Sequence, residues 1–132
     1  MTTNQKEINI KQLIKGYTIE TTPNVYEKFE TLSEYLPHGN DVYVTYLPDE
    51  DPRRIVNTSK KIIQEGLNAI PHLPARTIED YNMLENYIGS LSEEAGCNKI
   101  LVIGGSGKQV GIINSSLEIL QTNLLSKFNF KH

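Results

Sequence analysis

The sequence is poor in cysteine, in long apolar runs and in net charge. Cys97 is the only cysteine among 132 residues, so no disulfide can form within the chain and a reducing compartment is expected. No apolar run approaches the ~20 residues of a membrane-spanning helix, and the polar start has no signal-peptide core. The net charge of −3 gives no electrostatic reason to expect nucleic acid or an anionic membrane as a partner. No histidine has a cysteine or carboxylate at ligand spacing, so no metal is expected. We therefore expect a cytoplasmic protein without nucleic-acid or membrane partners.

The chain does contain one sequence pattern that occurs four times. In each copy, a short β-branched or apolar segment is followed by an amphipathic stretch with a helical period. The predicted strands cover residues 17–22, 42–47, 67–70 and 99–103. The third one is expected to end where two prolines flank His72, because strand interiors accommodate proline poorly. The length predicts one domain, residues 1–132, with a short arm at residues 1–15.

Capping residues mark the starts of the predicted helices. The expected caps are Asn24, Asp51, Thr77 and Ser115. From the spacing of apolar residues, the helix after Asn24 is expected to run to Leu36, the one after Thr77 to Ala95, and the last one to Phe128.

Four consecutive strand–helix units with short loops predict a parallel sheet with right-handed crossovers. Two architectures have this pattern, an open doubly wound sheet and a (β/α)8 barrel. A closed barrel takes about 250 residues, so the chain has room for half of one. In both architectures the loops that follow the strands share one edge of the sheet.

The loops at this edge hold the candidate site residues. Glu20 is acidic within a strand of Tyr, Ile and Thr. It either faces solvent or pairs with a lysine, or, if partly buried, it has a raised pKa that suits a general acid. His72 lies between prolines that fix the backbone around it, although a lone histidine is more often structural. Thr45, in the second predicted strand, has two explanations. Threonine is common in strands because of its β-propensity, or its hydroxyl bonds to a cofactor ring or a phosphate.

A glycine-rich loop, Gly104–Lys108, follows the fourth predicted strand. Its amides would suit an anion. The spacing is neither the G-x-x-x-x-G-K-[ST] of a Walker loop nor the G-x-G-x-x-G of dinucleotide-binding folds. A flexible loop is the simpler interpretation, and a phosphate-binding protein is the weaker functional alternative.

Four strings together resemble methylenetetrahydrofolate reductase, the flavin-dependent (β/α)8-barrel enzyme of one-carbon metabolism. The strings are Ile19-Glu20-Thr21-Thr22-Pro23, Val42-Tyr43-Val44-Thr45-Tyr46, Ala69-Ile70-Pro71-His72-Leu73 and Ile100-Leu101-Val102-Ile103-Gly104-Gly105-Ser106. Their order and gaps fit the family over roughly residues 16–110.

The resemblance implies an α/β fold in which the four units form half of a (β/α)8 TIM-type barrel. It implies that Glu20 is the catalytic general acid, which helps to open the methylene bridge of the folate, and that Thr45 and His72 contact FAD. In the family, hydride passes from NAD(P)H to the flavin and then to 5,10-methylenetetrahydrofolate, which gives 5-methyltetrahydrofolate. Ser106 stands where the family has the aspartate of Arg-Gly-Asp, and we expect it to help position the ligand.

Two departures from the family shape the expectation. The charge of that aspartate is missing, and strands five to eight of the barrel would lie beyond this sequence. We therefore expect a truncated or half-length relative, with a non-catalytic folate- or flavin-binding or assembly module as the alternative. Because a half barrel leaves strand edges unpaired, we also expect a homo-oligomer that forms through these edges.

Overall fold

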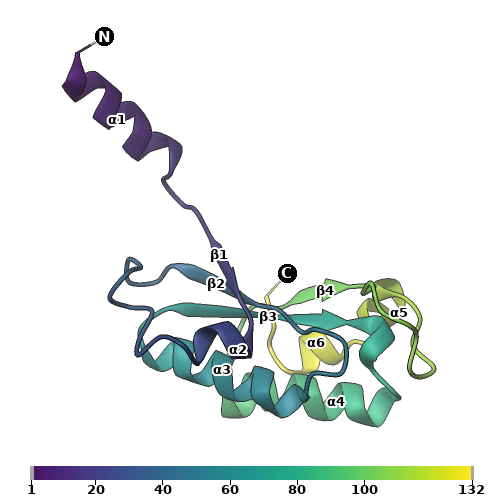
Figure 1. The fold of residues 1–132 in the computed structure, drawn as a ribbon. Helices are drawn as coiled ribbons and strands as arrows, with labels where there is room; N and C mark the ends of the chain where they lie inside the picture. Colours follow the sequence, from purple (N-terminus) through teal and green to yellow (C-terminus); the bar gives the residue numbers. More distant parts are fainter. Residues whose placement is uncertain (1, 132) are drawn as a thin grey trace.

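A four-stranded parallel sheet forms the centre of the molecule (Figure 1). The computed structural model describes residues 2–131. The strands are β1 (Ile19–Thr21), β2 (Asp41–Val44), β3 (Asn68–Pro74) and β4 (Leu101–Ile103). They lie in the order β1-β2-β3-β4, and every neighbouring pair is parallel. The predicted parallel α/β sheet is therefore confirmed.

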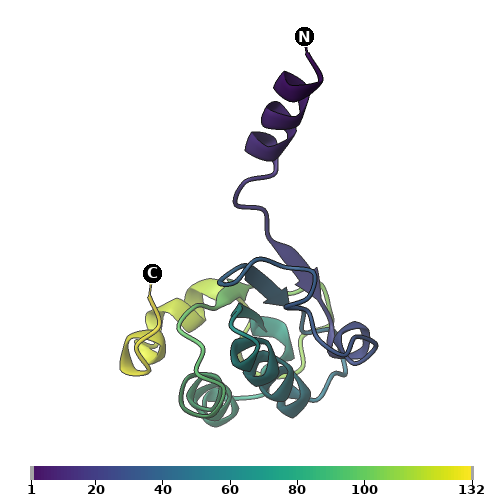
Figure 2. The ribbon, with the colours of Figure 1, turned by 90° about the vertical axis from the view of Figure 1, so that its left-hand side faces the viewer.

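The main helices cover one face of this sheet. The helices are α1 (Thr3–Leu13), α2 (Pro23–Tyr26), α3 (Pro52–Gln64), α4 (Tyr81–Gly89), α5 (Ser116–Gln121) and α6 (Leu124–Lys127). In Figures 1 and 2, α2, α3, α4 and α6 lie on the same side of the strands. Right-handed crossovers between sequential parallel strands produce this one-sided arrangement. A doubly wound sheet has helices on both faces, so that alternative does not fit the structure.

Side chains of each strand alternate between the helix side and the opposite side, which we call the open face. Val42, Val44 and Leu73 point to the helix side and are fully buried. The fully buried helix residues of the same core include Ile55, Ile62, Leu84, Ile88 and Ile119. On the open face, the register pairs Glu20 with Tyr43. The alternation along the strands thus separates the core from a second, partly polar surface.

β3 continues through Pro71 and Pro74, and the prediction that the strand ends there is wrong. The N–H of Asn68 donates to Asn40 on the β2 side, so the N–H positions of even residues in β3 face β2 and those of odd residues face β4. Pairing with β2 stops at Pro71, and pairing with β4 starts at His72. An N–H at Pro71 would face β4 before pairing with β4 begins, and an N–H at Pro74 would face β2 after pairing with β2 has ended. Neither proline therefore removes a hydrogen bond between strands.

α2 is a single turn, and the predicted helix up to Leu36 is wrong. Its N-cap is Thr22 rather than Asn24, because the Thr22 hydroxyl accepts a hydrogen bond from the N–H of Val25 at 3.2 Å. Pro23 then occupies the first helical position, where its missing N–H costs nothing.

The chain after α2 is held by one carboxylate, Glu65, which follows α3. This carboxylate accepts hydrogen bonds from the N–H groups of Leu32 at 2.6 Å and Ser33 at 2.9 Å, and from the Thr31 hydroxyl at 2.6 Å. The Tyr26 hydroxyl donates to its other oxygen. We call these five residues the Glu65 anchor. Backbone groups that bond to a side chain here are not free for a helical ladder, which explains the irregular segment.

α4 begins three residues later than predicted. Its cap is Asp80, whose carboxylate accepts from the N–H of Met83 at 2.7 Å. Thr77 instead donates its hydroxyl hydrogen to the carbonyl of Pro74 at 2.8 Å. The helix continues into a π-helical turn, Ser90–Glu94.

Two predicted caps are confirmed. Asp51 accepts from the N–H of Arg53 at 2.8 Å and starts α3. Ser115 starts α5, because its hydroxyl accepts from the N–H of Glu118 at 3.4 Å and donates to the Glu118 carboxylate at 3.0 Å. The last predicted helix is nevertheless divided, because Asn123 has a left-handed backbone (φ 58°) between α5 and α6.

α1 projects away from the sheet (Figures 1 and 2). Apolar side chains at its end are exposed, and Leu13 is 85% accessible to solvent. Within residues 2–131, no helix is both long enough and apolar enough to cross a membrane.

Candidate functional site

Three of the expected site residues lie together on the open face. Glu20 is in β1, Thr45 directly follows β2, and His72 is in β3. Thr45 continues the β2 alignment, because its N–H donates to the carbonyl of Thr21 at 2.8 Å. Its hydroxyl donates to the carboxylate of Glu20. Residues that are 25 positions apart in the sequence thus form one polar pair at the end of two neighbouring strands.

A cavity of about 460 Å³ opens beside this pair. We call it the open-face cavity; Glu20, Tyr43, His72 and Leu101 are among its lining residues. The rings of Tyr43 and His72 meet edge to face, with their centroids 6.2 Å apart. The cavity therefore combines a carboxylate, an imidazole and a phenol with an aliphatic surface.

His72 is held tightly on this face. Only 8% of the residue is exposed, and its carbonyl accepts a hydrogen bond from the hydroxyl of Tyr87 at 3.0 Å. Burial lowers the pKa of the imidazole below its usual value, and the nearby charge of Glu20 opposes this shift only in part. The side chain is thus a neutral imidazole at neutral pH, able to donate from one nitrogen and accept at the other.

Glu20 is exposed, so the partial burial expected of a general acid at this position is absent. Its position at the outer strand β1 explains this exposure, because no further strand covers it among the described residues. The solvent-facing alternative for Glu20 is therefore the one that the structure supports, with Thr45 as its hydrogen-bond partner.

Ser106 is separated from the other three residues. It is exposed in the loop after β4 and does not line the open-face cavity. The structure therefore does not bring this expected cofactor contact to the Glu20 pair.

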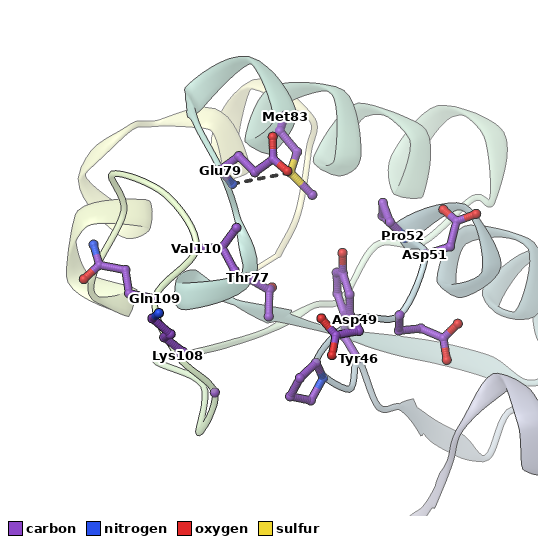
Figure 3. A pocket seen from close by; sticks show the side chains of 13 residues that line it. Tyr46, Asp49, Asp51, Pro52, Thr77, Glu79, Met83, Lys108, Gln109 and Val110 are labelled. Carbon is purple, nitrogen blue, oxygen red and sulfur yellow. Dashed lines mark hydrogen bonds between the residues drawn. The ribbon is translucent and has the colours of Figure 1, made fainter.

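A larger cavity, of about 770 Å³, lies at the carboxyl edge of the sheet (Figure 3). We call it the carboxyl-edge cavity. The loops after β2, β3 and β4 surround it and contribute Asp49, Glu79 and Lys108, respectively. Tyr46, from the end of β2, also lines it. Sequence reasoning missed Asp49 and Glu79, although both lie in loops that were expected to share this edge.

The glycine-rich loop is packed against the chain after β3. The N–H of Val110 donates to the carbonyl of Arg76 at 2.8 Å, and that of Ile112 to Glu79 at 3.1 Å. A Cβ atom at Gly111 would lie 1.9 Å from the Glu79 carbonyl oxygen, so only glycine fits there. The loop is therefore anchored, and it ends well before α5 instead of leading into a helix N-terminus as a phosphate loop does.

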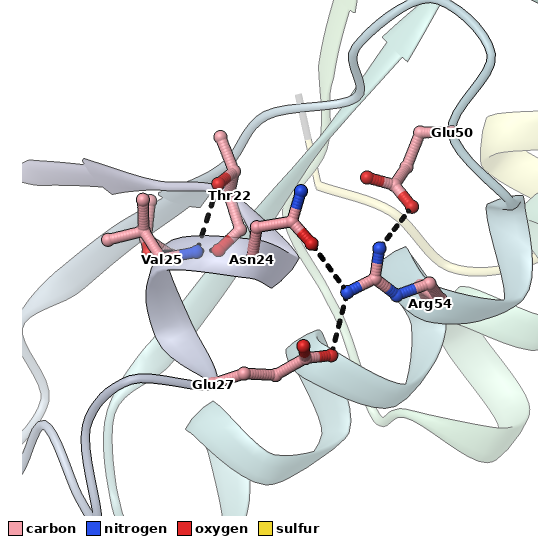
Figure 4. Close-up of polar contacts among 7 residues, drawn as sticks. Thr22, Asn24, Val25, Glu27, Glu50 and Arg54 are labelled. Carbon is pink, nitrogen blue, oxygen red and sulfur yellow. Dashed lines mark hydrogen bonds and ion pairs between the residues drawn. The ribbon is translucent and has the colours of Figure 1, made fainter.

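Arg54 of α3 joins three segments of the chain (Figure 4). Its guanidinium donates to Glu50 at 2.9 Å, to Asn24 at 2.8 Å and to Glu27 at 2.8 Å. These bonds join α2 to the loop between β2 and α3, so the segment that carries Glu20 and the loop that carries Asp49 are tied to one helix.

No family model matches the chain. Among the residues that the structure describes, no group of three His, Cys, Asp or Glu side chains is placed to hold a metal ion.

Proposed function

We propose that the chain is half of a (β/α)8 barrel that binds a flavin or a folate at its open face, as a truncated or half-length relative of methylenetetrahydrofolate reductase. The observation that carries this proposal is the arrangement of Glu20, Thr45 and His72 on one face of the sheet: Glu20 and His72 line the open-face cavity, and Thr45, directly after β2, is hydrogen-bonded to Glu20. The sequential strand order with helices on one side supports the half barrel, because the open face would then correspond to the barrel interior.

The lining of the open-face cavity fits a flavin ring. The neutral His72 imidazole would bond to the polar edge of the ring, and the Thr45 hydroxyl would reach that edge from beside the lining, next to Glu20. Leu101 and Tyr43 would shield the face of the ring from water. The chemistry that a bound flavin supplies is hydride transfer between NAD(P)H and the folate. Glu20 would hold or release a proton at its carboxyl group. Ser106 has no part in this arrangement.

A specific observation favours the alternative of a non-catalytic folate- or flavin-binding module. Glu20 is exposed, and its carboxyl group is already engaged as the acceptor of a hydrogen bond from the Thr45 hydroxyl. In this alternative Glu20 only orients the Thr45 hydroxyl.

Titration of the purified chain with FAD, followed by flavin fluorescence anisotropy, tests the binding site. Thermal shift with 5-methyltetrahydrofolate tests the folate in parallel. We expect saturable binding of at least one of them, and a loss of about tenfold in affinity in Thr45→Val and in His72→Ala, as for one lost hydrogen bond to a polar ligand. Glu7→Gln on the distant α1 is the control. A chain that takes up neither ligand would overturn the proposal.

Glu20→Gln separates the two candidate functions. If Glu20 is the acid, turnover of 5,10-methylenetetrahydrofolate with NAD(P)H and FAD is lost in this variant while ligand affinity changes little. If the chain is a binding module, the wild type has no turnover, and Glu20→Gln keeps nearly the same affinity.

The outer edges of β1 and β4 lead to the last part of the proposal, a homo-oligomer in the cytoplasm. Neither edge pairs with another strand among the described residues, and unpaired edges favour association. Solution scattering is expected to give at least twice the chain mass of 14.9 kDa. A compact monomer at micromolar concentration would contradict the association.

A further inference from the structure

We propose that the carboxyl-edge cavity is a binding site for a small organic cation, whose ammonium group is held by the Tyr46 hydroxyl and the carboxylates of Asp49 and Glu79. Tyr46 and Thr45 are consecutive residues and therefore point to opposite sides of the sheet. The site is thus independent of any ligand at the open face.

The first observation is the side chain of Tyr46. Only 6% of this residue is exposed, and its ring packs edge to face on Tyr87, with centroids 5.5 Å apart. Its hydroxyl makes no hydrogen bond within residues 2–131, and Figure 3 shows it pointing into the cavity. The ring is buried, whereas the oxygen itself is not fully enclosed and is open to the cavity. A ligand in this cavity would supply the partner.

The second observation is the charge around this hydroxyl. Four carboxylates line the cavity, and two of them are already engaged: Asp51 caps α3, and Glu50 is bonded to Arg54. Asp49 and Glu79 form no ion pair within the described part of the chain. Two carboxylates are therefore free to bind a cation.

The electrostatic potential at the Tyr46 phenol is also negative. Burial, followed by the charges of Asp51, Glu50 and Glu79, raises the pKa of Tyr46 to about 12. The phenol therefore keeps its hydrogen at neutral pH, and the negative field around it attracts cations and repels anions. Lys108 is the one cationic side chain in the lining, and it is exposed. A phosphate ligand for the glycine-rich loop is disfavoured for this reason.

The walls of the cavity indicate what the rest of the ligand is. Pro48, Pro52, Met83 and Val110 present apolar surface between the polar groups. A volume of about 770 Å³ admits a small molecule. Together with the carboxylates, these walls fit a short aliphatic amine.

Binding of n-butylammonium to the purified full chain tests this site, with n-butanol and butyrate as neutral and anionic counterparts of similar shape. Amide chemical shifts in a ¹H–¹⁵N NMR titration at neutral pH report binding and its location. We expect saturable shifts at the loops after β2 and β3 with the amine, and none with butanol or butyrate. No saturable binding of the amine, or equal binding of butyrate, would overturn the proposal.

Three matched variants locate the site. Tyr46→Phe removes one oxygen and keeps the ring on Tyr87, and Asp49→Asn removes one charge at a left-handed position (φ 63°) that asparagine tolerates. Each is expected to weaken amine binding about tenfold, as for one hydrogen bond to a charged group. Glu7→Gln makes the same charge change on exposed α1 and should have no effect. Unchanged affinity in both cavity variants, with native-like spectra, would refute the site. FAD binding is expected to persist in Tyr46→Phe, so the two proposals fail separately.

Discussion

Two ionisable side chains, His72 and Glu65, are kept in one protonation state by different means. His72 is buried beside few charges, so its neutral form is favoured. Burial of the Glu65 carboxyl group works to raise its pKa, but the hydrogen bonds from Thr31, Tyr26, Ser33 and Leu32 outweigh burial and lower it. Both groups therefore make the stability of the fold depend on pH, in separate windows.

His72 predicts a loss of stability in mild acid. Because its folded pKa lies below 6.5, the unfolded chain binds a proton that the folded chain resists as the pH falls below 6.5. The free energy of unfolding, from urea titrations, should fall from pH 6.5 until the folded pKa is reached, and be flat above pH 6.5 with respect to this group. His72→Asn should reduce that slope. Glu20→Gln should steepen it, since the charge that opposes the shift is gone. An equal slope in all three proteins would contradict the assignment.

The lowered pKa of Glu65 predicts a second loss of stability, at a lower pH than the loss that His72 causes. Its folded pKa lies below the usual 4.5, so its stabilising effect is complete above 4.5 and disappears as the pH falls through the folded value. Glu65→Gln is expected to lower the free energy of unfolding by about 2 kcal/mol at neutral pH, because it weakens hydrogen bonds to a charged acceptor. Glu30→Gln, nearby and exposed, is the control. A difference between Glu65→Gln and wild type that does not shrink in acid would contradict the role of the charge.

At the scale of elements, the loop after β4 depends on contact between two backbones. Gly111→Ala would place a methyl group against the Glu79 backbone, which cannot move aside as a side chain can. We expect a cost of about 3 kcal/mol in urea unfolding, the upper end for overpacking. Gly107→Ala is the matched control, since its Cβ would meet only the Pro48 side chain at 3.3 Å. Similar small costs for both substitutions would show that the loop is not held in this way.

The elements that sequence predicted well are those whose signals are local. Asp51 before Pro52 and Ser115 before Glu118 each satisfy amides of their own helix, so neighbouring residues suffice to find them. Where a partner is distant, the prediction failed. The helix after Asn24 is replaced by the Glu65 anchor, whose carboxylate lies more than 30 positions further along the chain.

For the candidate site, too, the sequence predicted the features that depend on local signals and missed those that depend on distant contacts. The placement of Glu20, Thr45 and His72 on one face follows from strand register and alternation, both of which the pattern indicates. The exposure of Glu20 and the isolation of Ser106 depend on how loops and outer strands pack, and no periodicity reports that. The carboxyl-edge cavity was missed because Asp49 and Glu79 become neighbours only when their loops fold over the same edge.

On the scale of the whole molecule, the sheet uses only one of its faces to build the core. The helices fill the space on one side, and the open face carries Glu20, Thr45 and the rings of Tyr43 and His72. This asymmetry makes the open face the natural place for a ligand or a second copy, since both would cover apolar surface that the chain itself leaves accessible.

α1 stands apart from this core and leads to the last prediction. Residues 9–18 are exposed along their whole length, and α1 extends away from the sheet in both views of the ribbon. Limited trypsin digestion should therefore cut first after Lys11 or Lys15, because exposed segments with few contacts open at little cost. The remaining fragment, identified by mass spectrometry, should unfold in urea within about 0.5 kcal/mol of the intact chain. First cuts at Lys99 or Lys108, or a clear loss of stability after removal of α1, would mean that this helix packs on the body of the molecule in solution.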